Sequence, residues 1–270
     1  MNKTIFKLED VYFSYLGRFP ALCAINIDIK QGQKVSFVGA NGSGKSTLLH
    51  MLDALIFPDK GTIQAFGKQL KESVLNDEGF SGDFRKNVGL VFQNPDIQLF
   101  CPTVKDDITF GPLQLGMGAK EIHKRMERIV DNLNIGSLLD RSPHQLSIGE
   151  KRKVAIASTL MVDPAVLILD EPTAGLDPLT TRHIIDLLIE ENACGKTIIT
   201  STHDLHMVAD IADIIYVFGQ DKKIAKFGPT AEILADMRLL EDNNLAHIHR
   251  HKHKDTEHTH PHQHLDHRSC

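Results

Sequence analysis

A glycine-rich segment that begins at residue 39 constrains the fold of this chain more than any other feature. Residues 39–47 read Gly-Ala-Asn-Gly-Ser-Gly-Lys-Ser-Thr and match the pattern G-x-x-x-x-G-K-[ST] of a phosphate-binding loop. Glycines let backbone N–H groups curl around a polyphosphate without clashes from Cβ atoms. Residues 34–38 predict a buried strand before the loop, and residues 46–52 predict a helix whose N-terminus attracts anions. This order favours a phosphate site over a chance glycine-rich turn.

The side chains of the loop have separate expected roles. The Lys45 ammonium group supplies a positive charge for the β and γ oxygens of a nucleotide, and the Ser46 hydroxyl is a ligand for Mg²⁺. Taken alone, such a loop is compatible with kinases, GTPases and motor proteins. The expected phosphate-binding residues are Gly39, Ala40, Asn41, Gly42, Ser43, Gly44, Lys45, Ser46 and Thr47.

Composition limits the class of protein. The chain has 270 residues, 41% of them hydrophobic, which is enough for one large domain or two small ones. Its net charge of -5 predicts no basic face for nucleic acid. No apolar run approaches the roughly 18 residues of a membrane span, no signal-peptide pattern opens the chain, and the cysteines form no C-x-x-C pair. We therefore expect a soluble, intracellular protein with reduced thiols that is able to dock on a membrane partner.

Hydrophobic periodicity predicts an α/β protein. The first thirty residues alternate between apolar and polar positions, as half-buried antiparallel strands do. Later segments follow a βαβ order, which predicts a parallel sheet. Residues 71–86 are expected to form a polar surface loop, and residues 103–160 to be mainly helical. The expected strands are 5–13, 24–29, 34–38, 62–67, 87–92, 165–169 and 197–200, and a helix is expected at about 178–192.

Polar side chains follow several of these strands. Asp170 and Glu171 end a buried strand at the sheet edge where α/β proteins bind ligands. Asp170 is expected to hold Mg²⁺, directly or through water, and Glu171 to polarise an attacking water as a general base. Gln93 is expected to reach the Mg²⁺ or the water, and His203 to lie near a γ-phosphate. The predicted catalytic residues are Glu171, His203 and Gln93, and the predicted Mg²⁺ ligands are Ser46, Gln93 and Asp170.

Three further motifs point to one family. Residues 146–152, Leu-Ser-Ile-Gly-Glu-Lys-Arg, resemble the signature sequence of ATP-binding cassette (ABC) ATPases. Residues 174–178 resemble the D-loop of that family, and Tyr15 resembles the aromatic residue that stacks on adenine. The resemblance runs from about residue 5 to residue 235. It implies an α/β P-loop NTPase core with a mixed sheet, an N-terminal antiparallel β subdomain and an inserted helical subdomain at about 94–160, all within a nucleotide-binding domain of residues 1–240.

The resemblance also implies a mechanism. Two copies face each other head to tail with two ATP molecules between them, and each ATP touches the phosphate loop of one copy and Ser147 and Gly149 of the other. The helix N-terminus after Ser147 would bind the γ-phosphate, and Asp177 would couple the two sites. The implied cofactors are ATP and Mg²⁺. The implied partner is a second ABC ATPase subunit; we favour a homodimer over a pair of paralogues because this chain carries every motif that two sites need.

The signature departs from the common family pattern at two positions. Ile148 stands where the family usually has glycine, and Glu150 stands where it usually has glutamine. Gly149, the glycine expected closest to the phosphate, is kept. We expect Ile148 to be tolerated if its side chain points away from the nucleotide.

Another segment predicts what the ATPase energises. Residues 91–100, Val-Phe-Gln-Asn-Pro-Asp-Ile-Gln-Leu-Phe, resemble the energy-coupling-factor branch of ABC importers, which includes cobalt and nickel uptake ATPases. The implied partners are a transmembrane coupling subunit, whose helices enter a groove near Gln93, and a membrane protein that binds the substrate. The implied location is the cytoplasmic face of the cell membrane, as a peripheral subunit. An ordinary ABC protein with a chance Asn-Pro-Asp-x-Gln is the alternative.

The C-terminal segment, residues 241–270, differs from the rest. Its apolar pattern collapses, so we expect a disordered tail. Neutral imidazoles suit Ni²⁺, Co²⁺, Cu²⁺ and Zn²⁺, so the tail is predicted to bind such ions loosely as a sensor or buffer, which favours nickel or cobalt uptake over vitamin uptake. A solvated low-complexity tail or an expression remnant is the alternative. The histidines concerned are His247, His249, His251, His253, His258, His260, His262, His264 and His267.

Three functions remain open on the sequence. The first is the ATPase of a nickel or cobalt importer, or of a vitamin importer of the same branch. The second is a soluble ABC ATPase acting on nucleic acid or ribosomes, but the single cassette, the lack of a coiled-coil insertion and the acidic charge disfavour it, so no nucleic-acid partner is expected. The third is a metal-handling protein whose tail is its main function, which leaves the ATP motifs unexplained. Copurification with membrane proteins, with nucleic acid or with neither would separate the three.

Overall fold

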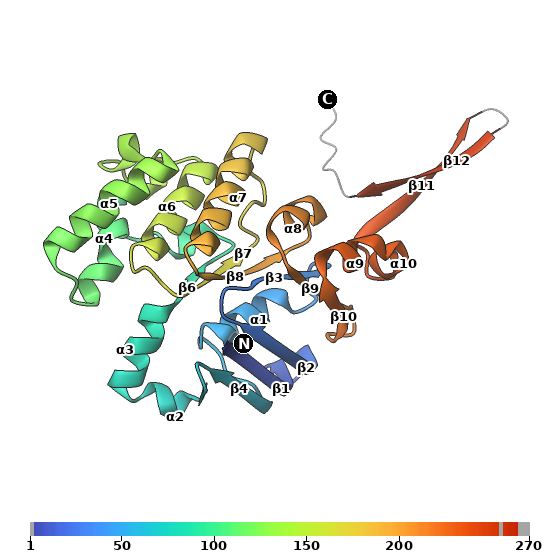
Figure 1. Cartoon of the computed structure of the whole chain (residues 1–270), viewed down its shortest axis with the longest axis horizontal. Coiled ribbons are helices and arrows are strands. Elements are labelled where there is room, and N and C mark those ends of the chain that lie inside the picture. Colours follow the sequence, from blue (N-terminus) through green and yellow to red (C-terminus); the bar gives the residue numbers. More distant parts are fainter. Residues whose placement is uncertain (1–2, 254–255, 264–270) are drawn as a thin grey trace.

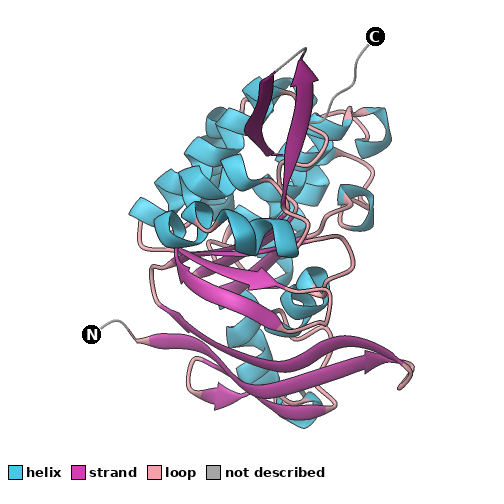
Figure 2. Cartoon of the chain, turned by 90° about the vertical axis from the view of Figure 1, so that its right-hand side faces the viewer, coloured by secondary structure: helices cyan, strands magenta, loops and turns pink. Residues whose placement is uncertain are grey.

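The computed structural model describes residues 3–253 and 256–263 and consists of two main sheets with helices around them (Figures 1 and 2). Its strands are β1 (Thr4–Tyr15), β2 (Phe19–Lys30), β3 (Lys34–Gly39), β4 (Lys60–Ala65), β5 (Lys68–Gln69), β6 (Val88–Val91), β7 (Val166–Asp170), β8 (Thr197–Thr202), β9 (Ile214–Phe218), β10 (Ile224–Pro229), β11 (Ala246–His253) and β12 (Thr256–Gln263). Its α-helices are α1 (Lys45–Leu52), α2 (Glu72–Leu75), α3 (Glu78–Asn87), α4 (Val104–Gln114), α5 (Ala119–Leu133), α6 (Ile148–Leu160), α7 (Pro178–Ala193), α8 (Leu205–Ile211), α9 (Thr230–Ala235) and α10 (Met237–Asp242). Short 3₁₀ turns lie at Pro95–Ile97, Gly136–Leu138 and Pro143–Gln145.

The six-stranded sheet positions the predicted site. Its strand order is β10-β9-β3-β8-β7-β6. All neighbours are parallel except β10, which is antiparallel to β9, so the sheet is mixed as expected. Every residue of β7 and of β8 is buried, as the continuous apolar character of strands covered on both faces predicts. Because β3, β6, β7 and β8 point the same way, the residues that follow them meet at one edge of the sheet.

The N-terminal strands form a separate antiparallel sheet with the order β2-β1-β4-β5. Its side chains alternate between buried and exposed positions along much of β1 and β2, which matches the period-2 pattern of the sequence. Figure 2 shows this sheet as a layer at one side of the molecule, away from most helices. The expected antiparallel β region is therefore confirmed.

Helix α1 is packed between the two sheets. A single core cluster contains Phe6 and Ile25 of the antiparallel sheet, Leu48 and Leu49 of α1, and Ile168 of β7, all fully buried. Burying such side chains stabilises the fold by about 1.5–3 kcal/mol each. The helix that follows the phosphate loop is thus fixed on both sides, which holds the loop in place.

The opposite face of the six-stranded sheet is covered by helices. A second core cluster joins β7 and β8 to helices α4, α5, α6, α7 and α8. Figure 1 shows α4, α5 and α6 gathered at one end of the molecule, and all three fall within the expected helical region 94–160. The division into subdomains stays a prediction. Among the described residues, no helix combines the length and apolar character that a membrane span requires.

The prediction of a surface loop at 71–86 is wrong, because most of this segment is helical. Helix α3 begins after Asp77, whose carboxylate accepts hydrogen bonds from the N–H groups of Gly79 and Phe80 at 2.9 and 3.3 Å. Phe80 and Phe84, four residues apart, are both buried against the main core. The high polarity and the two glycines of the segment concealed this single apolar stripe.

The C-terminal region contains elements that the sequence did not predict. Strand β9 and helices α8, α9 and α10 contribute to a third core cluster, which also includes Val38 of β3 and reaches to Leu245 and Ala246, beyond the expected domain boundary at residue 240. The segment expected to be disordered contains strands β11 and β12, paired as an antiparallel hairpin that projects from the body in Figure 1. The alternation of histidine with other residues has the period of a strand.

Candidate functional site

The phosphate loop joins β3 to α1 in a tight turn that depends on glycine. Gly44 has φ +111°, and a Cβ atom there would lie 2.3 Å from the carbonyl oxygen of Ala21. A Cβ atom at Gly39 would lie 2.7 Å from Ser43 Oγ. The Ser43 hydroxyl is buried and has no hydrogen-bond partner among the described residues. A buried unpaired hydroxyl is costly, and a phosphate oxygen bound in the loop would satisfy it.

Lys45 is held inside the loop. Its Nζ donates hydrogen bonds to the carbonyl oxygens of Gly39 and Ala40, at 2.7 and 3.2 Å. The residue is only 6% exposed, and this burial lowers the pKa of its ammonium group, against the opposing effects of Glu171 and Asp170. The positive charge therefore faces neutral carbonyl groups, and a polyphosphate would be a stronger partner.

The loop opens into a cavity of about 380 Å³, which brings together most of the predicted nucleotide-binding residues. Tyr15 stands at its edge and is linked to α1 by a 3.1 Å hydrogen bond between its hydroxyl and that of Thr47. Tyr15 is 43% exposed, as a residue that stacks on a base requires. The lining residues are Tyr15, Phe19, Pro20, Ala21, Asn41, Gly42, Gly44, Lys45, Ser46, Thr47, Gln93, Glu171 and Lys222.

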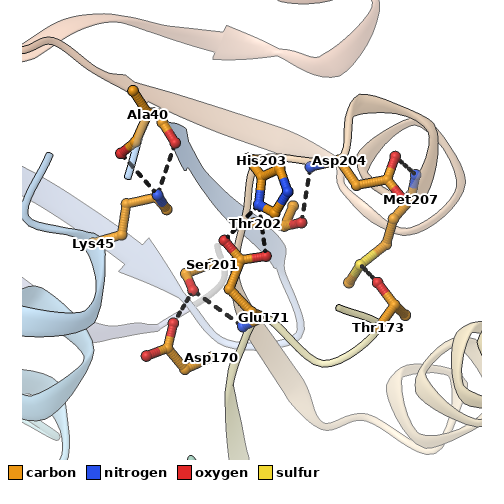
Figure 3. A network of polar contacts seen from close by, with 11 residues as sticks. Ala40, Lys45, Asp170, Glu171, Thr173, Ser201, Thr202, His203, Asp204 and Met207 are labelled. Atoms are coloured by element: carbon orange, nitrogen blue, oxygen red, sulfur yellow. Dashed lines mark hydrogen bonds and ion pairs between the residues drawn. The ribbon is translucent and has the colours of Figure 1, made fainter. Parts of the chain in front are cut away.

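The two acids at the end of β7 have different environments. Asp170 is buried and its carboxylate accepts a hydrogen bond from the Ser201 hydroxyl of β8 (Figure 3). Glu171 lines the cavity although it is only 5% exposed. Its backbone has φ 47°, a left-handed conformation that costs energy for a residue with a side chain, and its N–H donates to the Ser201 carbonyl at 3.0 Å. Packing against β8 thus aims the Glu171 carboxylate at the cavity.

His203 follows β8 and contacts this carboxylate directly. Its Nδ1 lies 3.0 and 3.1 Å from the two Glu171 oxygens (Figure 3). The hydrogen bond with Glu171 raises the pKa of His203 above its usual 6.5, although partial burial acts in the opposite direction. The ring itself is not part of the cavity lining, so it is placed to orient Glu171.

The Gln93 loop is fastened to helix α6. Arg152 of α6, 2% exposed, donates to the carbonyl oxygens of Phe92 and Gln93. Gln98 of the same loop donates through Nε2 to the Ala155 carbonyl at 2.9 Å. These contacts fix the backbone on both sides of Gln93, whose side chain reaches the cavity.

The predicted Mg²⁺ ligands fit a hard divalent cation. Ser46 and Gln93 both line the cavity and offer a hydroxyl and an amide oxygen. Asp170 offers a carboxylate one residue from the cavity-lining Glu171. Mg²⁺ prefers oxygen ligands and keeps several waters, so a sparse set of this kind is compatible with it.

The signature residues lie outside the cavity of their own chain. Ser147 caps α6, and its N–H and hydroxyl donate to Glu150 Oε2 at 2.7 and 2.8 Å. Gly149 lies in the first turn of α6. Asp177 caps α7, and its carboxylate accepts a hydrogen bond from the Thr180 N–H at 3.0 Å. Ile148 is 63% exposed and makes no part of the core, as expected for a side chain that points outward.

The tail histidines are only partly described. His247, His249, His251 and His253 lie in β11, and His258, His260 and His262 lie in β12. The register places His247 opposite His262, His249 opposite His260 and His251 opposite His258. His264 and His267 lie outside the described residues.

Sequence reasoning missed three residues that shape the site. Ser201 binds Asp170, Arg152 holds the Gln93 loop, and Lys222 lines the cavity. Lys222 is separated from the phosphate loop by 180 residues, so no local pattern links the two. Arg152 stands within the signature segment in a run of charged residues, so the sequence pattern gives no signal that its side chain is buried.

Comparison with known proteins yields a consistent set of relatives. A family model described as ABC transporter matches residues 22–174. The chain is 49% identical over 238 residues to the nickel import ATP-binding protein NikO of Rhodobacter capsulatus, covering 87% of this chain and 93% of that protein. It is 43% identical over 241 residues to the energy-coupling factor transporter ATP-binding protein EcfA of Methanocaldococcus jannaschii, covering 89% and 85%.

Two solved structures share the fold closely. One is cbiO1 of Clostridium perfringens, described as part of the ABC transporter complex cbiONQ, with a TM-score of 0.76, 36% identity, and coverage of 91% of this chain and 96% of that one. The other is the ATP-binding cassette MJ0796, solved as a dimer bound to ADP and Pi, with a TM-score of 0.75, 28% identity, and coverage of 84% and 99%.

Proposed function

Because this chain belongs to the ABC transporter family, we propose that it is the ATP-hydrolysing subunit of a membrane importer for nickel or cobalt ions. Family membership makes it an ABC-type ATPase whose hydrolysis is coupled to transport. The observation that carries the site assignment is the convergence of Lys45, Gln93 and Glu171 on one cavity. The import of metal is supported by the nickel-import relative, which matches over 87% of this chain.

In the proposed reaction Glu171 is the general base. It takes a proton from a water, the oxygen of that water attacks the γ-phosphorus of ATP, and the bond to the β–γ bridging oxygen breaks, so that ADP and phosphate leave. His203 contacts both Glu171 oxygens and so orients the base. The Lys45 ammonium group stabilises the charge on the phosphate oxygens. When bound, Mg²⁺ neutralises further phosphate charge, and Ser46, Gln93 and Asp170 are the residues that would hold it.

A second copy completes the site in this proposal. Ser147, Gly149 and Asp177 do not line the cavity of their own chain, so a role at the nucleotide requires that they come from a neighbour. Ser147 and Gly149 stand at the start of a 13-residue helix whose N-terminal N–H groups attract an anion. MJ0796, a relative of similar fold, forms a dimer with ADP and Pi. We favour a homodimer in which ATP joins the two chains.

An apolar surface near Gln93 suits a membrane subunit. Ile97, Phe100 and Leu113 are 66%, 65% and 58% exposed, and Phe110 is 42% exposed. The rings of Phe100 and Phe110 contact each other at 5.0 Å between centroids, so the two side chains form one patch. Exposed apolar side chains gathered in this way mark an interaction site. We propose that helices of the coupling subunit dock here, with the chain peripheral on the cytoplasmic face of the membrane.

The decisive experiment is transport by the reconstituted complex. The chain is produced together with the membrane subunits that copurify with it, and uptake of radioactive Ni²⁺ and Co²⁺ is measured in proteoliposomes supplied with ATP. We expect uptake of one or both ions, no uptake with Glu171→Gln, and loss of ATP binding with Lys45→Ala. Copurification with nucleic acid, or uptake of a vitamin and of neither metal, would overturn the proposed cargo.

A further inference from the structure

A second lysine faces the nucleotide cavity from outside every motif of the family. Lys222 lies in the turn between β9 and β10, and its Nζ donates a 2.6 Å hydrogen bond to the carbonyl oxygen of Gly42 in the phosphate loop. It lines the same cavity as Lys45 and Glu171. None of the roles assigned to the site so far uses this ammonium group.

The backbone holds Lys222 firmly in this place. Its carbonyl oxygen accepts a 2.9 Å hydrogen bond from the N–H of Cys23 in β2, and its own N–H donates to Gly219 at 3.2 Å. Its φ of 66° is a left-handed conformation that this tight turn imposes. The backbone thus fixes the point from which the Lys222 side chain extends toward the phosphate loop.

Lys222 and Lys45 make the same kind of contact with one loop. Lys45 Nζ donates to the carbonyl oxygens of Gly39 and Ala40, and Lys222 Nζ donates to that of Gly42. Carbonyl oxygens are neutral acceptors, whereas phosphate oxygens carry negative charge and so attract an ammonium group as an ion pair as well as through a hydrogen bond. Both lysines therefore stand to gain when a polyphosphate enters the cavity.

The charge of the cavity supports this reading. Its charged lining residues in the described structure are Lys45, Lys222 and Glu171, a net charge of +1 that becomes zero without Lys222. A nucleoside triphosphate carries several negative charges. The charge of Lys222 therefore decides whether the lining of the cavity has a net positive charge that attracts the nucleotide or no net charge.

We propose that Lys222 is a phosphate-binding residue, which contacts the polyphosphate of the bound nucleotide in addition to Lys45. The inference rests on the proposed ATP site and adds a residue to it. Lys222 thereby favours nucleotides with two or three phosphates over those with one.

The test compares nucleotides that differ in phosphate number. Dissociation constants of ATP, ADP and AMP are measured by calorimetry for the wild type and for Lys222→Met, which removes the charge and keeps the length of the side chain. We expect roughly tenfold weaker binding of ATP and ADP, the loss typical of one charge-assisted hydrogen bond, and little change for AMP. Lys222→Arg should retain most of the affinity. The matched control is Lys223→Met, the adjacent exposed lysine, which should bind like the wild type.

The outcomes separate the proposal from its alternatives. Equal weakening for all three nucleotides would mean that Lys222 only supports the shape of the loop, and unchanged binding of ATP would mean that it does not contact the phosphates; either result overturns the proposal. A thermal unfolding midpoint measured without nucleotide shows whether Lys222→Met is folded. If Lys45→Met binds ATP as well as the wild type does, the ATP site itself is misassigned. This outcome differs from a failure of the Lys222 proposal, in which Lys45→Met still loses ATP binding.

Discussion

The Arg152 side chain donates two hydrogen bonds to the backbone of the Gln93 loop. Its Nη2 lies 2.6 Å from the carbonyl oxygen of Gln93, and its Nη1 lies 2.8 Å from the carbonyl oxygen of Phe92. Arg152 stands in the second turn of α6, the helix that Ser147 caps. The loop that reaches the chain's own cavity and the helix that we propose to face a second copy are therefore parts of one connected unit. We therefore expect a shift of either one to move the other, which would give a physical route between the nucleotide and the apolar surface around Phe100.

Replacing Arg152 by lysine tests this connection. Lysine keeps the charge, but its shorter side chain lacks the planar fork with which Arg152 donates to both carbonyl oxygens from two nitrogens, so at least one of these part-buried hydrogen bonds is weakened. We expect the free energy of unfolding to fall by about 2 kcal/mol and kcat for ATP hydrolysis to fall, while ATP affinity stays the same because Lys45 is untouched. Urea unfolding and steady-state kinetics measure both quantities, with Lys153→Arg as control. A stable variant with normal kcat would show that the contact is not needed.

Most of the nucleotide cavity could be predicted from the sequence because its residues belong to short, local patterns. The phosphate loop, Asp170–Glu171 and Gln93 each follow a strand, and the parallel sheet then brings them to one edge. Lys222 and Ser201 could not be found in this way, since each reaches the site through contacts between segments far apart in the chain. What they contact depends on the strand order, which the sequence pattern did not define.

The fold was harder to predict where polarity concealed the pattern. Helix α3 was missed because its buried stripe consists of only Phe80 and Phe84 in a polar segment. Strands β9 and β10 were not among the predicted elements, although β9 is almost wholly buried. In α3 tertiary packing, rather than local propensity, selects the element, whereas the β9 sequence Ile-Ile-Tyr-Val-Phe has high strand propensity of its own.

The contact between His203 and Glu171 predicts a measurable titration. Glu171 is the main cause of the raised pKa of His203, so the Glu171→Gln variant should return that pKa toward 6.5. NMR of the imidazole protons measures both values. Because the pKa is raised in the folded state, the contact adds to the free energy of unfolding below about pH 6.5, and this contribution is lost as the pH rises through the folded-state value. An identical His203 titration in the two proteins would contradict the contact.

The Glu150 carboxylate is expected to weaken the association of two chains in the closed, ATP-bound dimer. This carboxylate accepts hydrogen bonds from the N–H and the hydroxyl of Ser147, at 2.7 and 2.8 Å. These hydrogen bonds lower the pKa of Glu150, so the carboxylate is ionised at neutral pH. The proposal places a γ-phosphate at the same position. Glu150→Gln removes this repulsion. In the Glu171→Gln background we expect an ATP-dependent dimer about fivefold tighter by ultracentrifugation, with the difference shrinking at high salt. Glu72→Gln, in the first turn of α2, is the control; a dimer weakened by Glu150→Gln would refute the repulsion.

The histidine-rich segment predicts separable metal binding. Deleting residues 247–270 spares the third core cluster, which ends at the buried Ala246, so ATP hydrolysis should be largely unchanged. Ni²⁺ binding measured by calorimetry should decrease, and binding by the whole chain should weaken below about pH 6, when imidazoles are protonated. Equal Ni²⁺ binding by the two forms would rule out a metal-binding tail.

The central claim is that one ATP is held by the phosphate loop of one chain and by the signature segment of another. Two single-cysteine proteins test it most directly, Asn41→Cys and Ile148→Cys, each in the Glu171→Gln background with the native cysteines replaced, since both positions are exposed. Mixed together under mild oxidation, they should form a disulfide-linked dimer with ATP present, and neither protein should do so alone. If the mixture yields no linked dimer with ATP, the shared site does not exist and the account is contradicted.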